Sequence, residues 1–193
     1  MARRSTSMES KARELLEELA IRSIPVPVEK VARTLGARVY YSPLDEELSG
    51  MIYVKDDVPI IGVNSLHHPN RQRFTIAHEV AHLRLHREHI TRTVHVDKRF
   101  SDSVLRRDAT STQGTKLLEI EANQFAAALL VPRHRLEEEL RARELDIEDE
   151  AALEALARTF RVSKATLQYR IRNLPTGTST ARTLTRKIGL SAK

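Results

Sequence analysis

The feature that most constrains this chain is the stretch from Phe74 to His86, which reads FTIAHEVAHLRLH and contains the pattern H-E-x-x-H. Residues four apart lie one turn above each other on one face of an α-helix, so His78 and His82 can point two imidazoles at a single ion. Zn²⁺ accepts such a pair. Glu79 is rotated to the flank of the helix, where it can take a proton from an attacking water molecule rather than bind the metal.

This pattern requires a helix, and the surrounding sequence predicts one. No Gly or Pro interrupts residues 71–88, and Asn70, which follows Pro69, is the expected cap. One stripe at helical spacing combines apolar residues with the two histidines: Phe74, Ala77, His78, Ala81, His82 and Leu85. The alternative is a core helix with two hydrogen-bonded histidines, but a glutamate directly after the first histidine favours a metal site.

Composition limits the possible classes of protein. With 193 residues, the chain fits one compact domain, or one domain with a small appendage. It contains no cysteine, so a metal must be held by histidine and carboxylate groups. No apolar run approaches the length of a membrane span, and the polar first ten residues lack the apolar core of a signal peptide. We therefore expect a cytoplasmic protein without membrane contact.

The first half of the chain predicts an α+β fold with a small, mostly antiparallel sheet. Two helices are expected before the sheet, over residues 9–21 and between Pro27 and Gly36. Strands are expected over 37–41, 49–54 and 58–63, with a hairpin between the last two. Pro59 cannot donate to a strand ladder, which favours an edge position for its strand, where a substrate strand could add.

Two groups of residues remain open as minor candidates. Tyr40, Tyr41 and Tyr53 are candidates for the donor to an oxyanion by residue type only. The polar stretch 88–115 has little periodicity, so it is expected to be a long loop that could wall or cover a cleft. His95 in this stretch is a weak candidate ligand, whereas His67 and His68 are expected to face water.

A helix is expected over residues 116–132, and it carries the candidate third ligand. Glu121 shares a face with Leu118 and Phe125, where a carboxylate is costly unless it is paired or binds a metal. Glu119 lies two residues earlier and points to nearly the opposite side, so only one of the two can face the metal. Taken alone, Glu121 could reach water at the edge of the stripe. Because the two histidines need a third ligand, we expect Glu121 to be that ligand.

Residues 146–175 form a second region that resembles a helix-turn-helix. One apolar stripe ends at Phe160, Arg161 and Val162 form a turn, and Ser163 can cap the next helix. No acidic residue follows Glu154, and this basic bias fits contact with nucleic-acid phosphates. The alternative is a helical appendage packed on the metal domain with a solvated basic face. Residues 176–193 are expected to be a flexible basic tail.

The sequence also resembles a known family. Residues 73–82 (RFTIAHEVAH) and 121–132 (EANQFAAALLVP), together with 60–64 (IIGVN) and 156–163 (LARTFRVS), are similar to the ImmA/IrrE metallopeptidases. The resemblance covers roughly residues 10–175. The family often has glycine where this chain has Ala81 and Arg161. The second departure weakens a strict helix-turn-helix assignment.

The resemblance implies a zincin-like metallopeptidase domain over 9–145 that binds Zn²⁺. His78, His82 and Glu121 would be its ligands and Glu79 its catalytic base. Members of the family are bacterial or mobile-element proteins that relieve repression, by cleaving or by binding a helix-turn-helix repressor. The predicted function is therefore site-specific cleavage of such a repressor. The alternatives are a non-catalytic antirepressor or toxin–antitoxin partner, and a DNA-binding regulator that acts through its basic C-terminal region.

Overall fold

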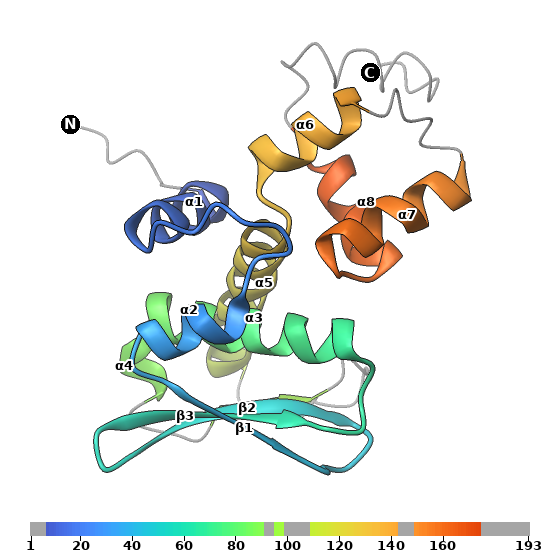
Figure 1. The fold of residues 1–193 in the computed structure, drawn as a ribbon. Helices are drawn as coiled ribbons and strands as arrows, with labels where there is room; N and C mark the ends of the chain where they lie inside the picture. Colours follow the sequence, from blue (N-terminus) through green and yellow to red (C-terminus); the bar gives the residue numbers. More distant parts are fainter. Residues whose placement is uncertain (1–6, 91–94, 99–108, 143–148, 175–193) are drawn as a thin grey trace, which may run out of the picture.

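A computed structural model describes residues 7–90, 95–98, 109–142 and 149–174 (Figure 1). It has the expected α+β class, with one small sheet and helices gathered on one side of that sheet. The predicted tail, 176–193, lies outside the described residues. None of the described helices is both long enough and apolar enough to cross a bilayer.

The sheet contains four strands in the order β1-β3-β2-β4. Their bounds are Arg38–Ser42 for β1, Leu48–Lys55 for β2, Val58–Asn64 for β3 and His95–Lys98 for β4. β3 pairs in parallel with β1 and antiparallel with β2, and β2 pairs antiparallel with β4. Two of these three pairings are antiparallel, so the predicted small, mostly antiparallel sheet is confirmed.

The β2–β3 hairpin turns at Asp56 and Asp57. Both residues have positive φ angles, 51° and 63°. Two-residue turns of this kind match the twist of the flanking strands, and aspartate tolerates the left-handed region better than most residues do. The hairpin expected at this place is therefore present.

The predicted edge position of residues 58–63 is wrong, because β3 lies inside the sheet between β1 and β2. The parallel ladder with β1 begins only at Ile60, which is opposite Arg38. Pro59 precedes this ladder, so its missing N–H is not needed there. Among the described strands, the open edges belong to β1 and β4, and a substrate strand would have to add there.

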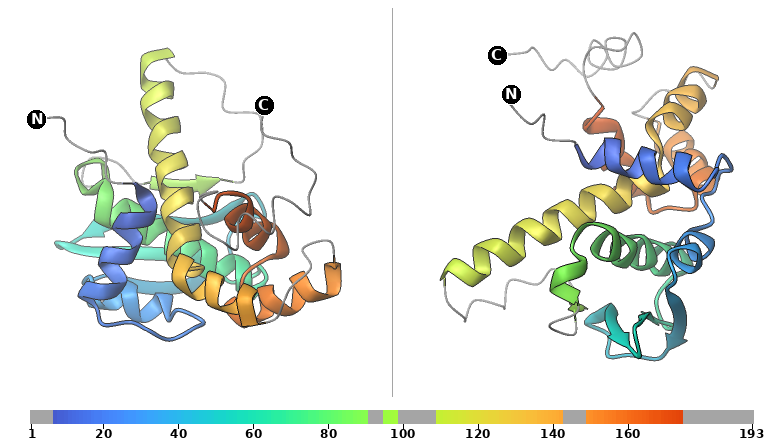
Figure 2. Two further views of the ribbon diagram at one scale, coloured as in Figure 1. Left: turned by 90° about the horizontal axis from the view of Figure 1, so that it is seen from above. Right: turned by 90° about the vertical axis from the view of Figure 1, so that its left-hand side faces the viewer.

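Eight helices occur in the described part of the chain. Their bounds are α1 Met8–Glu18, α2 Val28–Thr34, α3 Pro69–Leu85, α4 Arg87–Ile90, α5 Ala109–Leu130, α6 Arg133–Ala142, α7 Glu150–Phe160 and α8 Lys164–Arg172. The expected long loop 88–115 thus contains β4 and the beginning of α5, whose N-terminal end projects beyond the other elements (Figure 2). α6, over Arg133–Ala142, is not among the helices expected from the sequence.

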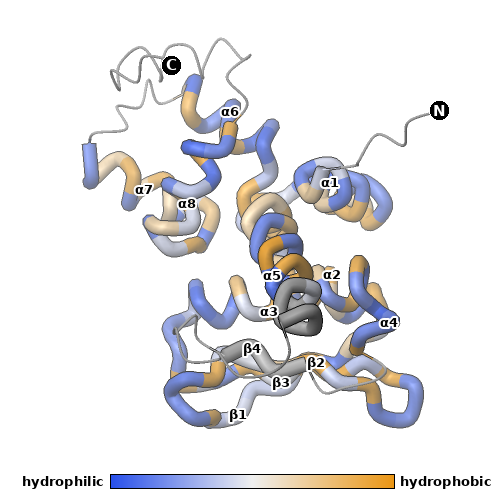
Figure 3. Tube along the Cα trace, turned by 180° about the vertical axis from the view of Figure 1, so that it is seen from behind, coloured by the Kyte–Doolittle hydropathy of each residue, from blue (hydrophilic) through white to orange (hydrophobic). Residues whose placement is uncertain are grey.

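α3 lies across the sheet and packs against α5 on its other side (Figure 1). The contact with the sheet is close at Gly50 of β2, because a Cβ atom there would collide with the Thr75 side chain of α3 and with the Gly62 carbonyl. The apolar second half of α5 lies in the middle of the molecule (Figure 3). There α5 is buried nearly all round, so its buried surface is not a single stripe.

α7 and α8 form the expected helix-turn-helix-like pair. Asp149 and Ser163 cap the two helices with their side chains. Arg161 ends α7 in the left-handed conformation, with φ 51° and ψ 53°, where glycine is the favoured residue. The backbone thus adopts the left-handed turn with an arginine at the position where glycine is favoured.

The α7–α8 pair packs on the rest of the molecule rather than standing apart. Leu156, Phe160 and Leu167 belong to the same apolar core as α3 and α5. The buried Arg170 guanidinium lies 2.6 Å from a carboxylate oxygen of Glu9 in α1 and donates to the Val131 carbonyl at 3.1 Å. This continuity supports the packed-appendage alternative for residues 146–175.

Candidate metal centre

α3 presents three histidines along one face. His78, His82 and His86 are four residues apart, and their neighbouring rings lie with centroids 4.7 Å and 5.3 Å apart. The helix starts at Pro69 with His68 as its cap, not Asn70, and ends with His86 as its C-cap. All three histidines are buried. The local sequence therefore fixes their alignment before any contact with α5.

α5 supplies the carboxylate that faces this histidine row. Oxygen atoms of Glu119 lie 3.2 Å from Nε2 of His78 and 3.4 Å from Nε2 of His82. The two Nε2 atoms are 3.0 Å apart. The Glu119 side chain keeps 24% of its surface exposed, so this cluster of three residues has access to solvent on the side of α5.

The electrostatics of this cluster favour an ionised carboxylate. Burial on its own raises the pKa of the Glu119 carboxyl, but the hydrogen bonds and charges that His78 and His82 supply in their protonated forms outweigh burial. The pKa of this carboxyl is therefore held well below its usual range. A carboxylate that stays ionised beside two imidazoles is suited to bind a cation.

The hydrogen bond of the His78 ring and the spacing of the donor atoms indicate whether His78, His82 and Glu119 fit a metal. Nδ1 of His78 lies 3.1 Å from Oδ1 of Asn123, an acceptor, so Nδ1 carries the proton. The neutral ring then offers a bare Nε2 to the cluster. Two imidazole nitrogens and a carboxylate repel one another at about 3 Å separations unless a proton or a metal cation lies among them. The donor set thus fits Zn²⁺, which binds three such ligands in its catalytic sites.

Donor atoms of His78, His82 and Glu119 all lie within 4.8 Å of one another, which is compatible with one shared ion. Among the described residues, this is the only group of at least three histidine or carboxylate side chains that meets this criterion. Glu79 is the next residue of α3 after His78 and is fully buried. The structure therefore brings the sequence-predicted pair of histidines together with Glu119, and Glu79 occupies the buried helix position after His78.

The third residue of the cluster differs from the sequence prediction, which preferred Glu121. In the structure, the Glu121 carboxylate lies 3.0 Å from Nε2 of His86, one turn away from the cluster. The preference relied on the bulky stripe of Leu118 and Phe125, but α5 is buried on several faces. The face that carries Glu119 continues through Ala122 and Ala126, and small buried residues allow close packing of two helices.

Sequence reasoning missed Asn123 and His86. Asn123 lies four residues after Glu119, so it shares the face of α5 that turns toward His78. His86 lies four residues after His82 and continues the same row on α3. A search for polar residues at the next helical turn beyond each ligand would have found both.

The three candidate tyrosines do not join this cluster. The Tyr41 hydroxyl donates to Glu29 of α2 at 2.6 Å, and burial and this hydrogen bond raise the pKa of its phenol. Tyr40 and Tyr53 are opposite Gly62 and Ile60 of β3, so they lie on the face of the sheet opposite to that of Ile61, which joins the core. The described structure supports no oxyanion role for them.

The other histidine predictions have mixed outcomes. His68 is exposed and caps α3 through Nδ1, which accepts from the Asn70 N–H at 3.1 Å. His67 is half-buried and contacts the Glu46 carbonyl, and neither residue belongs to the cluster of His78, His82 and Glu119. His95 lies in β4, but its side chain is outside the described residues.

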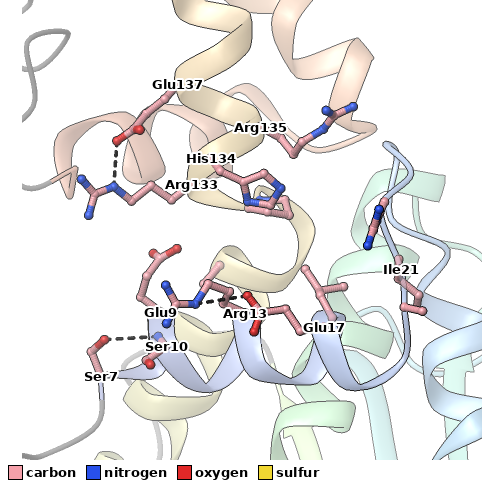
Figure 4. Close-up of a pocket in the computed structure, with 15 residues that line it drawn as sticks. Ser7, Glu9, Ser10, Arg13, Glu17, Ile21, Arg133, His134, Arg135 and Glu137 are labelled. Atoms are coloured by element: carbon pink, nitrogen blue, oxygen red, sulfur yellow. Dashed lines mark hydrogen bonds and ion pairs between the residues drawn. The ribbon is translucent and has the colours of Figure 1, made fainter.

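A separate hollow of about 870 Å³ lies between α1 and α6. Polar and charged side chains of both helices line it, among them Arg13, Glu17, Arg133 and His134 (Figure 4). Glu137 on its wall is already paired with Arg133 at 2.7 Å. None of His78, His82 and Glu119 lines this hollow.

The fold and the histidine–glutamate site define a zincin-like metallopeptidase domain. The chain belongs to the Peptidase_M78 family, whose model, the IrrE N-terminal-like domain, matches residues 32–172. This finding confirms the family that the sequence resembles. Peptidase_M78 membership indicates a function of the metallopeptidase type.

A solved structure gives independent support for the fold. A Mycobacterium tuberculosis transcriptional regulator is similar with a TM-score of 0.62 and 20% sequence identity. The match covers 90% of this chain and 48% of the regulator, so this chain spans about half the length of that protein. At this identity the likeness concerns the fold alone. No curated protein matches the sequence.

Proposed function

We propose that this chain is a zinc-dependent endopeptidase that relieves transcriptional repression by cutting a helix-turn-helix repressor at one or a few bonds. The observation that carries the proposal is the convergence of His78, His82 and Glu119 beside the helix position of Glu79. A structural zinc site has four protein ligands, whereas a catalytic site has three and leaves one position open. Three donors converge here.

The roles of the residues follow from their chemistry. His78, His82 and Glu119 would hold the ion through two Nε2 atoms and one carboxylate. When bound, Zn²⁺ acts as a Lewis acid that polarises a carbonyl and makes water more acidic. Glu79 accepts a proton from the attacking water and then donates it to the nitrogen of the leaving amine. Asn123 accepts from Nδ1 of His78 and so keeps the Nε2 of that ring turned to the site.

The choice of partner rests on the family and on charge. The similar structure is named a transcriptional regulator, which agrees with a place in gene regulation. The net charge of +6 favours an acidic surface on the partner. The proposal places the protein in the cytoplasm, where a repressor of this kind would be met.

Direct DNA binding by α7 and α8 is the weaker candidate. In this pair, Arg170 is buried against Glu9, and Lys164 lies 3.3 Å from a carboxylate oxygen of Glu150. These two cations of the helical pair are therefore already engaged within the protein. A contact with nucleic acid would have to use other basic residues, and its affinity would fall steeply with salt.

The test is incubation of the zinc-loaded protein with the helix-turn-helix repressor encoded beside its gene, followed by intact-mass analysis. We expect one or a few fragments, none with chelator and none with Glu79→Gln. Casein serves as the control substrate and should remain largely whole. Derepression that survives Glu79→Gln would favour the antirepressor that acts by binding alone, and broad casein degradation would contradict a specific protease.

A further inference from the structure

A chain of side-chain contacts leads from the clustered ligands to the far side of His86. Nδ1 of His82 lies 3.2 Å from Nδ1 of His86, and Nε2 of His86 lies 3.0 Å from a carboxylate oxygen of Glu121. His82 and His86 are buried, whereas 43% of the Glu121 side chain is exposed. This series of contacts thus connects the buried His82 with a carboxylate at the surface.

The direction of these hydrogen bonds follows from the acceptor at the end of the chain. A carboxylate offers only lone pairs, so Nε2 of His86 must carry a proton and donate a hydrogen bond to Glu121. In the neutral ring, Nδ1 of His86 is then an acceptor. It can accept only from Nδ1–H of His82, so a neutral His82 ring keeps its lone pair at Nε2.

This tautomer is the one that a ligand at Nε2 requires. Nε2 of His82 is the atom that lies beside Glu119 and His78. Ligating histidines usually donate their other ring N–H to a carboxylate or carbonyl, which fixes the ring and makes the ligand nitrogen more basic. In this protein, His86 is interposed between the ligand ring and the carboxylate.

We infer that His86 and Glu121 are positioning residues, which act as a relay that holds His82 in the ligand tautomer and orientation. Neither residue binds the ion in this account. The inference gives Glu121 a role other than that of the ligand predicted from sequence. It rests on the metal site of the proposed function, although its first test below does not need the metal.

The first test uses the zinc-free protein. Nitrogen-15 NMR of the histidine rings at about pH 8.5, two units above the ordinary histidine pKa, reports which nitrogen carries the proton. We expect His82 to be protonated at Nδ1 and His86 at Nε2 in the unaltered protein. In Glu121→Ala, the His86 ring should become a mixture of tautomers. A His82 ring that carries no proton at Nδ1 in the unaltered protein would overturn the relay.

The second test measures zinc affinity by competition with a chelating dye. Glu121→Ala and His86→Ala should each weaken affinity by roughly 10–100-fold, as outer partners of metal ligands do. Because the two residues act in series, the double variant should lose little more than either single variant. Glu138→Ala and His134→Ala are matched controls on α6, and they should leave the affinity unchanged.

The outcomes separate the relay from its rivals. A loss from Glu121→Ala as large as that from Glu119→Ala would make Glu121 a ligand and overturn the relay. Additive losses in the double variant, or no loss in either single variant while the unaltered protein binds zinc, would also overturn it. If the unaltered protein bound no zinc, the proposed function would fall, and the tautomers in the zinc-free protein would still decide the relay.

Discussion

The Nε atom of Arg73 donates a hydrogen bond of 3.2 Å to the carbonyl oxygen of Arg161. This bond joins the first turns of α3 to the turn between α7 and α8. One residue further on, the Val162 carbonyl accepts from the side-chain amide of Asn70 at 3.0 Å. The helix that carries His78 and His82 is therefore tied at its N-terminal end to the helical pair.

The left-handed conformation of Arg161 leads to the first prediction. An L-residue in this region costs about 1–2 kcal/mol, and glycine avoids this strain. Part of the gain is lost again, because glycine gives the unfolded chain more conformational freedom. Arg161→Gly should therefore raise the free energy of unfolding by roughly 0.5–1 kcal/mol. Arg161→Ala removes the same side chain but keeps the strain, so it should bring no gain. Equal stabilities of the two variants in urea unfolding would contradict the account.

Gly50 gives the second prediction, because a methyl group there would collide with Thr75 and with the Gly62 carbonyl. Gly50→Ala should lower the free energy of unfolding by about 1–3 kcal/mol, as overpacking typically does. Gly114→Ala is the matched control. A Cβ atom at Gly114 meets nothing within 4 Å, and alanine favours a helix, so this variant should be neutral or slightly more stable.

The third prediction concerns metal content. Protein purified without added metal should contain one divalent ion per chain, natively Zn²⁺, and a strong chelator should remove it. The double variant His78→Ala/His82→Ala should lose the ion, because only Glu119 of the cluster remains. Elemental analysis measures this directly. Full zinc content in the double variant would place the ion elsewhere.

The fourth prediction separates the two glutamates of α5. Glu119→Ala removes a ligand, so it should weaken zinc affinity by roughly 100-fold or more, beyond the usual effect of an outer partner. Glu121→Ala should weaken affinity less, because its carboxylate contacts His86 and not the cluster. Calorimetric titration of both variants with zinc measures the order. The reverse order would restore Glu121 as the ligand.

Glu79→Gln provides the fifth prediction. Glutamine has nearly the same shape but cannot accept the proton, so turnover should fall by about 10²–10⁴-fold. Zinc content and melting temperature should stay close to those of the unaltered protein. A variant that still cuts the repressor at an unchanged rate would show that another group is the base.

The sequence predicted features that depend on local spacing and missed those that depend on distant contacts. The alignment of His78 with His82 follows from one helix, so the motif alone was sufficient. The position of Glu119 depends on how α5 is rotated against α3, and a helix that is buried on several faces does not reveal this rotation. Likewise, Pro59 suggested an edge strand, but only the starting point of β1 explains why an inner strand tolerates it.

The shared core of α7 and α8 has a consequence for how the molecule can be divided. A polypeptide that ended after α6 would expose the surface that Leu156, Phe160 and Leu167 cover, and it would leave Glu9 without the Arg170 guanidinium. We therefore expect the whole assembly to unfold in one cooperative transition. Recombination could not exchange the helical pair for another module without rebuilding the surface that receives it.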